Sequence, residues 1–164
     1  MSKTASKPAT KSSASSDAIS LLMDDHKKVK KLFKEFEKLA KAEDVDGKVE
    51  IANQICEELT VHATIEEEIF YPAARNAIND EDMLNEAEVE HATAKDLIAQ
   101  ILEMAGDDPM YDATVKVLSE YINHHVEEEE TEMFPKAKKA KMDLEGLGVQ
   151  LMERKEELSA EAVA

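Results

Sequence analysis

The chain has 164 residues, the size of one ordinary domain with a hydrophobic core of its own. Apolar residues make up 43% of it, with only 4 glycines and 4 prolines and no long uncharged apolar run, which excludes a collagen-like chain and a membrane span. The formal net charge of −17 repels polyanions, so we expect no nucleic acid partner. The single cysteine, Cys56, cannot form an internal disulfide, and the N-terminus lacks the apolar stretch of a secretory signal. We therefore expect a cytoplasmic protein with no membrane partner.

The N-terminal segment differs in composition from the rest of the chain. Residues 1–16 contain three lysines, no acidic residue and no apolar face. Nothing in this segment would offset the entropy lost on ordering it. We expect residues 1–16 to form a disordered basic tail, which could serve as a flexible linker or a weak electrostatic tether.

From Ser16 onward, apolar residues recur with the helical period of 3.6 and never alternate as in a strand. This pattern predicts four long helices, roughly over residues 17–42, from 48 into the seventies, 81–105 and 110–141. Ser16 is a candidate N-cap for the first helix, and Pro72 is expected to kink or end the second. Four amphipathic helices with short connections predict an all-α fold, an antiparallel up-down four-helix bundle.

The C-terminal part of the chain follows two glycines, Gly146 and Gly148. The segment VQLMERKEELS after them predicts a short fifth helix lying against one end of the bundle. The expected organisation is therefore a bundle over residues 17–142 and a C-terminal short helix and tail over residues 143–164.

Each of the four long helices carries one histidine within its apolar stripe, and two of them carry a glutamate four residues later. These six residues are His26, His62, Glu66, His91, His125 and Glu129. Residues four apart are neighbours on a helix surface, so each HxxxE pair points two ligand-type side chains at one spot. A histidine on an apolar face is more often a hydrogen-bonded core residue, and one HxxxE is weak in a chain with 37 acidic residues.

The positions of the turns predict that the six side chains share one level in the bundle. On an antiparallel hairpin, two residues lie at the same height when they are equidistant from the turn. His26 and His62 are centred on Asp44, and His91 and His125 are centred on Asp108, both within predicted turns. Four histidines and two carboxylates in one dry layer would cost several kcal/mol each if they were left unpaired, whereas a bound metal removes that cost. The sequence therefore predicts a metal site.

The chain also contains an internal repeat. HATIEEEIFYP from His62 and HVEEEETEMFP from His125 share the histidine, glutamates at +4 and +5, an aromatic residue at +9 and a proline at +10. An acidic residue precedes the first histidine of each half, in Asp25-His26 and Glu90-His91. The spacing H, HxxxE, H, HxxxE on four helices resembles the hemerythrin-like, HHE cation-binding proteins over roughly residues 18–158.

This resemblance implies a hemerythrin-like bundle with a non-haem di-iron centre, in which two iron ions share an oxo or hydroxo bridge. It implies terminal nitrogen ligands from the four stripe histidines and bridging carboxylates from Glu66 and Glu129. Independently of the resemblance, mixed imidazole and carboxylate ligands inside a bundle suit iron or manganese, and zinc less specifically.

Several residues around the predicted site are expected to support it without binding the metal. Asp25 and Glu90 are expected to accept hydrogen bonds from the imidazoles, as metal-bound histidines usually require. Tyr121 is expected to pack in the core, with a hydrogen bond to the site as the alternative. Cys56 is expected to be a small buried hydrophobe. Four glutamates are expected to form a solvated face, with a role in iron entry as the alternative: Glu127, Glu128, Glu130 and Glu132. Three phenylalanines are expected to be core residues, with gating of a pocket as the alternative: Phe33, Phe70 and Phe134.

The sequence departs from the oxygen carriers of the family at Lys95, where they have a further histidine one turn after His91. His124 could replace that nitrogen only by turning into the stripe that His125 occupies. We therefore expect a more open centre that binds dioxygen, nitric oxide or peroxide for sensing, storage or detoxification. The alternatives are an enzyme that decomposes peroxide or oxidises ferrous iron, and an iron-buffering module without redox chemistry.

Overall fold

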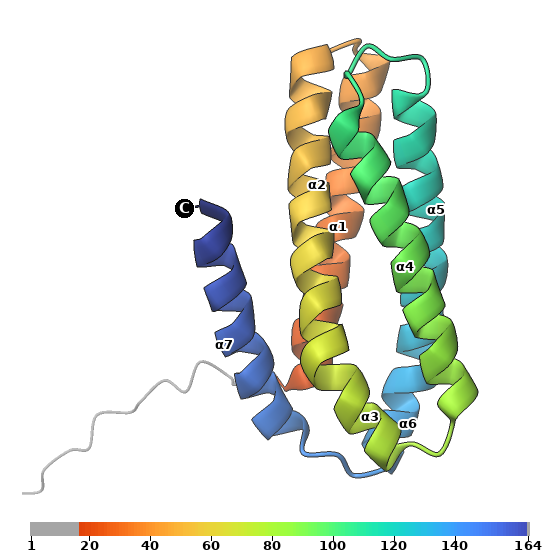
Figure 1. Cartoon of the computed structure of the whole chain (residues 1–164), viewed down its shortest axis with the longest axis vertical. Coiled ribbons are helices and arrows are strands. Elements are labelled where there is room, and N and C mark those ends of the chain that lie inside the picture. Colours follow the sequence, from red (N-terminus) through yellow and green to blue (C-terminus); the bar gives the residue numbers. More distant parts are fainter. Residues whose placement is uncertain (1–16, 164) are drawn as a thin grey trace, which may run out of the picture.

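The computed structural model describes residues 17–163, so the predicted N-terminal tail lies outside the described residues. Four long helical segments run alternately up and down, and a fifth helix lies beside them (Figure 1). The helical elements are α1 (Ala18–Lys41), α2 (Val45–Ile65), η1 (Glu66–Phe70), α3 (Tyr71–Ala77), α4 (Glu81–Glu103), α5 (Tyr111–Glu128), η2 (Glu129–Met133), α6 (Phe134–Lys139) and α7 (Leu144–Val163). The predicted all-α up-down four-helix bundle with a fifth helix is confirmed.

Aspartates begin three of the long helices. The side chain of Asp17 accepts a hydrogen bond from the backbone N–H of Ser20 at 2.8 Å, so Asp17 is the N-cap that the sequence analysis placed at Ser16. Asp44 and Asp80 cap α2 and α4 in the same way. Each carboxylate satisfies an N–H group that the first helical turn leaves unpaired, which fixes where the helix starts.

The second and fourth helical segments each contain a π-helical turn, η1 and η2, that ends two residues before a proline. Pro72 and Pro135 lack a backbone N–H, and their rings would collide with the carbonyl four residues earlier in a regular α-helix. The wide turn absorbs this conflict, because the N–H of Tyr71 bonds to the carbonyl of Glu66 five residues earlier. The helix therefore continues past Pro72 as α3, and the extra residue buries Phe70 and Tyr71 in place of Ile69.

The apolar core consists of two parts, one on each side of a polar layer. Leu22, Ile65 and Leu84 belong to one part, and Ile55 and Leu118 belong to the other. All five side chains are fully buried, and each contributes roughly 1.5 to 3 kcal/mol to the free energy of unfolding. The stripe histidines lie between these parts, in the layer that the spacing of the turns predicts.

The fifth helix, α7, packs along α1 and α2 (Figure 1). It begins at Leu144 and has 20 residues, so it is longer than the segment expected from the sequence. Asp143 accepts a hydrogen bond from the N–H of Gly146 at 3.0 Å, which starts the helix before the two glycines. Leu151 is fully buried in the core, and Lys155 reaches the carboxylate of Asp25.

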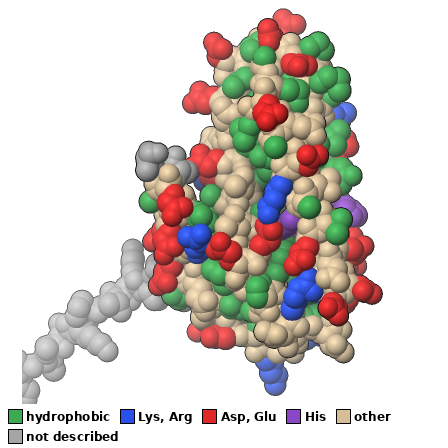
Figure 2. Space-filling model, viewed as in Figure 1, with side chains coloured by type: hydrophobic (Ala, Val, Ile, Leu, Met, Phe, Trp, Pro, Cys, Tyr) green, Lys and Arg blue, Asp and Glu red, His purple; other side chains and the backbone are tan. Residues whose placement is uncertain are grey.

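Acidic side chains are spread over the face of the bundle seen in Figure 2. Among the helices of residues 17–163, none combines the length and the apolar character needed to cross a bilayer. The acidic side chains on this face agree with the negative net charge of the chain.

Candidate metal centre

Six polar side chains meet in the layer between the two parts of the core. Each is at most 7% exposed, although all are polar or ionisable. They come from all four long helical segments, and they are the six residues selected from the sequence: His26, His62, Glu66, His91, His125 and Glu129. The structure thus brings together every residue of the predicted ligand set.

The six side chains form two adjacent groups, each with donor atoms within 4.8 Å of one another. One group contains His26, His62 and Glu129, and the other contains Glu66, His91 and His125. Glu129 reaches both groups, because its Oε1 lies 3.1 Å from His26 Nε2 and its Oε2 lies 3.1 Å from His125 Nε2. Glu66 Oε1 similarly lies 2.8 Å from His62 Nε2 and 3.5 Å from His91 Nε2. Each carboxylate is therefore placed between the two groups.

The donor set fits a bound cation. Within residues 17–163, the buried Nε2 atoms of His26 and His62, both oxygens of Glu66 and Oε1 of Glu129 have no hydrogen-bond partner. Leaving such atoms dry and unpaired is costly, and a cation would satisfy them together. Donors that share one ion at about 2.1 Å lie roughly 3.0 to 3.4 Å apart, which is close to the separations observed here.

The imidazoles and carboxylates of this layer shift one another's pKa values. Burial alone would lower the pKa of His62, but the negative charge of Glu66 and the hydrogen bond to Asp25 outweigh it and raise that pKa to about 10. The pKa of His125 is likewise raised, against the effect of burial, by Glu129. Burial would raise the pKa of Glu129, but His125 holds it well below its usual value. Cation binding would therefore displace protons from these imidazoles.

The Nδ1 atom of each of the four histidines faces a carboxylate from another helical segment. Asp25 lies 2.9 Å from His62 Nδ1, and Glu90 lies 3.3 Å from His125 Nδ1, so both predicted partners are confirmed. The other two partners, Glu67 and Glu130, are not predicted from the sequence.

Glu67 and Glu130 each follow one of the central glutamates. Glu130 Oε1 lies 3.2 Å from His26 Nδ1, so this residue does not belong to the solvated face to which it was assigned. Glu67 Oε2 approaches His91 Nδ1 to 3.4 Å, and Glu67 Oε1 binds Lys95 Nζ at 2.6 Å. The four contacts run from the first helical segment to the second, third, fourth and back to the first, which closes a ring of carboxylate–imidazole pairs.

Tyr71 is the central residue that sequence reasoning overlooked. Its hydroxyl donates a hydrogen bond to Glu129 Oε2 at 2.7 Å and lies 3.1 Å and 3.2 Å from the Nε2 atoms of His91 and His125. The signal was present in the repeat, because Tyr71 is the aromatic residue at position +9 after His62. In a regular α-helix, residues 66 and 71 would point about 140° apart, whereas the wide turn brings both inward.

Other candidate residues occupy several environments. The side chain of His124 is 64% exposed and lies 3.2 Å from Glu128, outside the buried groups. Tyr121 is 43% exposed, so it is not a core residue as expected, and it does not fit the alternative of a hydrogen bond to the centre. Cys56 is buried as expected, and burial raises the pKa of its thiol to about 11. The three phenylalanines are core residues: Phe33, Phe70 and Phe134.

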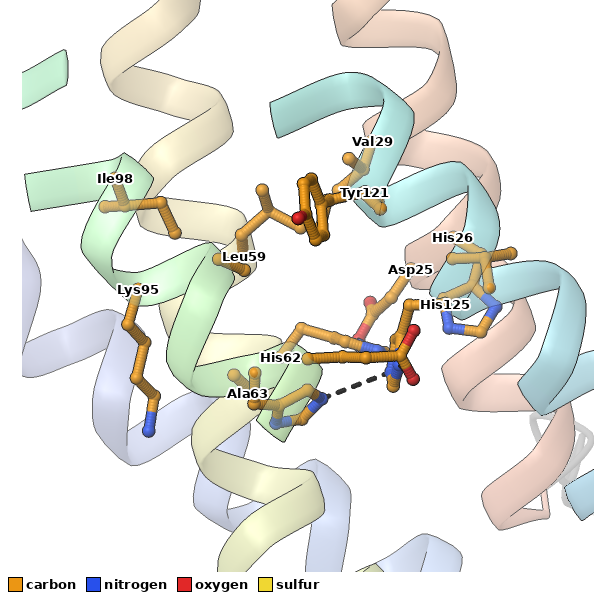
Figure 3. A pocket seen from close by; sticks show the side chains of 15 residues that line it. Asp25, His26, Val29, Leu59, His62, Ala63, Lys95, Ile98, Tyr121 and His125 are labelled. Atoms are coloured by element: carbon orange, nitrogen blue, oxygen red, sulfur yellow. Dashed lines mark hydrogen bonds and ion pairs between the residues drawn. The ribbon is translucent and has the colours of Figure 1, made fainter. Parts of the chain in front are cut away.

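A pocket with mostly apolar walls reaches the histidines from one side (Figure 3). Val29, Leu59, Ile98 and Ile122 line it. Lys95 also lies at this pocket, but its side chain points away from the histidines (Figure 3). A small uncharged molecule could approach the polar layer along this path.

Comparisons with known proteins agree with this architecture. A family model described as the hemerythrin HHE cation-binding domain matches residues 17–137. A solved structure, the HHE domain-containing Rv2633c homolog from Mycobacterium kansasii, superimposes with a TM-score of 0.74 over 90% of both chains, at 24% identity. A DNA nickase from Nostoc sp. strain PCC 7120 is 34% identical over 110 residues, which are 67% of this chain and 30% of that protein.

The family match covers the whole polar layer and all four long helical segments. Its printed description assigns cation binding to the domain, and the two buried groups of histidines and glutamates in this chain have donor atoms suited to a cation. The nickase is much longer than this chain, so that match concerns a minor part of it. The chain belongs to the hemerythrin HHE cation-binding domain family.

Proposed function

We propose that this protein holds two non-haem iron ions in its polar layer and binds dioxygen, nitric oxide or peroxide there. The observation that carries the proposal is the position of Glu129, which offers one oxygen to each donor group at 3.1 Å from a histidine nitrogen. A carboxylate placed in this way is suited to bridging two ions. In this proposal Glu66 and Glu129 bridge, and the terminal ligands are His26, His62, His91 and His125.

The chemistry of the donors favours iron over most other metals. Imidazole together with carboxylate suits iron or manganese, whereas the one thiol, Cys56, lies outside both donor groups. Bound iron would supply reversible one-electron chemistry and open coordination positions for a small ligand. The chain holds the imidazoles in position through the carboxylates on their Nδ1 atoms, which raises their basicity as ligands.

The pocket walls favour a small uncharged ligand. Val29, Leu59, Ile98 and Ile122 give much of the approach an apolar lining, which disfavours ordered water there, whereas the charged residues of the pocket are Asp25, Glu90 and Lys95. The net charge of −17 opposes a polyanion, so DNA is not part of the proposed function despite the nickase relative. A cytoplasmic location is part of the proposal.

A second candidate is an enzyme that decomposes peroxide or oxidises ferrous iron. Lys95 favours it, because this side chain turns outward to Glu67 and α4 contributes only His91 to the donor groups. Fewer protein ligands leave more positions for exchange with water and peroxide. Iron buffering without redox chemistry remains the third alternative.

The test is anaerobic reconstitution with ferrous iron, followed by emission analysis and absorption spectroscopy in air. We expect two irons per chain and the near-ultraviolet bands of a bridged ferric pair after oxidation. One metal per chain, or retention of zinc alone after iron was supplied, would remove the di-iron proposal. Sustained peroxide turnover by intact protein would select the enzyme over the ligand-binding protein.

A further inference from the structure

The two halves of the repeat differ at one position beside the donor groups. Tyr71 and Phe134 each follow a central glutamate by five residues and precede a proline, and both are buried. Phe134 stacks on His26 with ring centroids 6.0 Å apart and an interplanar angle of 5°. Tyr71 instead presents an oxygen atom to the group formed by Glu66, His91 and His125.

The hydroxyl oxygen of Tyr71 has the spacing of a metal donor. It lies 3.1 Å from His91 Nε2 and 3.2 Å from His125 Nε2, and those two nitrogens are 3.2 Å apart. The three atoms form a nearly equilateral triangle. Donors bound to one ion at about 2.1 Å have this separation, roughly 3.0 to 3.4 Å.

We propose that the phenolic oxygen of Tyr71 is a further ligand of the ion held by Glu66, His91 and His125, which makes the two metal positions inequivalent. This inference rests on the proposed function. On binding a ferric ion, a bond forms between Oη and the metal, the O–H bond breaks and the proton leaves to water. No electron is transferred in this step.

The hydroxyl is buried among groups that would favour a bound cation, because it donates a hydrogen bond to Glu129 Oε2 at 2.7 Å and lies beside two imidazole nitrogens. A ferric ion at this position would place a positive charge next to the phenolic oxygen. The phenolate then supplies a hard anionic oxygen, a ligand type that suits oxidised iron.

The inequivalence has a consequence for ligand binding. The position formed by Glu66, His91 and His125 gains a protein donor, whereas Phe134 offers none to the position formed by His26, His62 and Glu129. The position formed by His26, His62 and Glu129 therefore keeps more coordination sites open for an exogenous ligand. A small exogenous ligand is expected to bind at the ion on the Phe134 side.

Three proteins test the inference: the wild type, Tyr71→Phe and Tyr111→Phe. Tyr111 is a matched control, because it is also buried, it belongs to the core part around Ile55 and Leu118, and its hydroxyl has no hydrogen-bond partner among the described residues. Each protein is loaded anaerobically with ferrous iron, oxidised in air and examined by absorption and resonance Raman spectroscopy. We expect a visible phenolate-to-iron band with tyrosine ring vibrations in the wild type and Tyr111→Phe, and complete loss of both in Tyr71→Phe.

The inference is overturned if the oxidised wild type holds two irons without phenolate vibrations, or if the vibrations persist in Tyr71→Phe. The first result leaves the proposed function intact, whereas a wild type that binds no iron overturns both. If Tyr71→Phe does not fold, wild-type protein labelled with ring-deuterated tyrosine decides the matter. Its resonance-enhanced bands must then shift relative to unlabelled protein, and unshifted bands would refute ligation by tyrosine.

Discussion

Replacing each of the adjacent histidines 124 and 125 by alanine tests the proposed ligand register directly. His125 is buried, and its Nε2 lies 3.1 Å from Glu129 Oε2 and 3.2 Å from His91 Nε2. His125→Ala removes a ligand from one of the two positions, so iron content should fall from two ions per chain to about one. His124→Ala should retain both ions, because that side chain is 64% exposed.

Thermal stability gives this prediction a magnitude. An ion present at 100 times its dissociation constant stabilises the folded protein by about 2.7 kcal/mol. For a domain of this size, each kcal/mol changes the melting temperature by about 2 to 4 °C. Iron loading should therefore raise the melting temperature of His125→Ala by roughly 5 to 11 °C less than it raises that of the wild type. The exposed ion pair of His124 with Glu128 contributes at most about 1 kcal/mol.

The assay is emission analysis of both iron-loaded variants, with melting curves recorded before and after loading. Comparing the gain on loading, instead of the absolute melting temperature, separates ligand loss from the cavity that alanine leaves in the fold. If His124→Ala loses iron while His125→Ala keeps two ions, the register assigned to α5 is wrong.

Three further predictions concern the surroundings of the site. Asp25→Asn should weaken iron binding about 10- to 100-fold in competitive chelator titrations, because it weakens the hydrogen-bond acceptor for His62 Nδ1. Asp24→Asn changes an exposed neighbour and should leave the affinity unchanged. Equal affinities of the two variants would contradict the role of Asp25. The diferrous protein should pass to a stable ferric state within minutes in air, and Lys95→His should slow this in stopped-flow measurements; full recovery of the diferrous spectrum under argon would refute the open centre. Burial raises the pKa of Cys56 to about 11, against 9.0 for a free thiol. The free energy of unfolding should therefore keep its full value below pH 9 and fall by roughly 2 to 3 kcal/mol as the pH rises to 11. Cys56→Ala should remove this part of the alkaline decline in urea titrations.

The sequence was sufficient to predict the bundle and the six central residues because both follow from helical periodicity. His26 and His91 lie in uninterrupted α-helices, where a period of 3.6 places each side chain reliably. The spacing of the turns then sets their common height. The internal repeat indicated Asp25 and Glu90, which immediately precede these histidines.

Prediction was incomplete where the helical period changes. The wide turn η1 adds a residue to the helical turn. A prediction that assumes a constant period therefore places Ile69 in the core and misses the inward position of Tyr71. Glu67 and Glu130 lie in such turns, and sequence spacing alone could not show that they face histidines on neighbouring helices. The prolines after the turns are the residues that could have revealed the change.

The closed ring of carboxylate–imidazole pairs has a consequence for local opening of the fold. Each long helical segment both supplies a carboxylate to one neighbour and receives one from another, as α1 does through Asp25 and His26. Releasing any one segment breaks two such contacts at once and exposes buried imidazole, so the contacts oppose the opening of a single segment. Amide hydrogens around His26, His62 and His91 should therefore exchange with solvent together and late, whereas α7 can exchange separately.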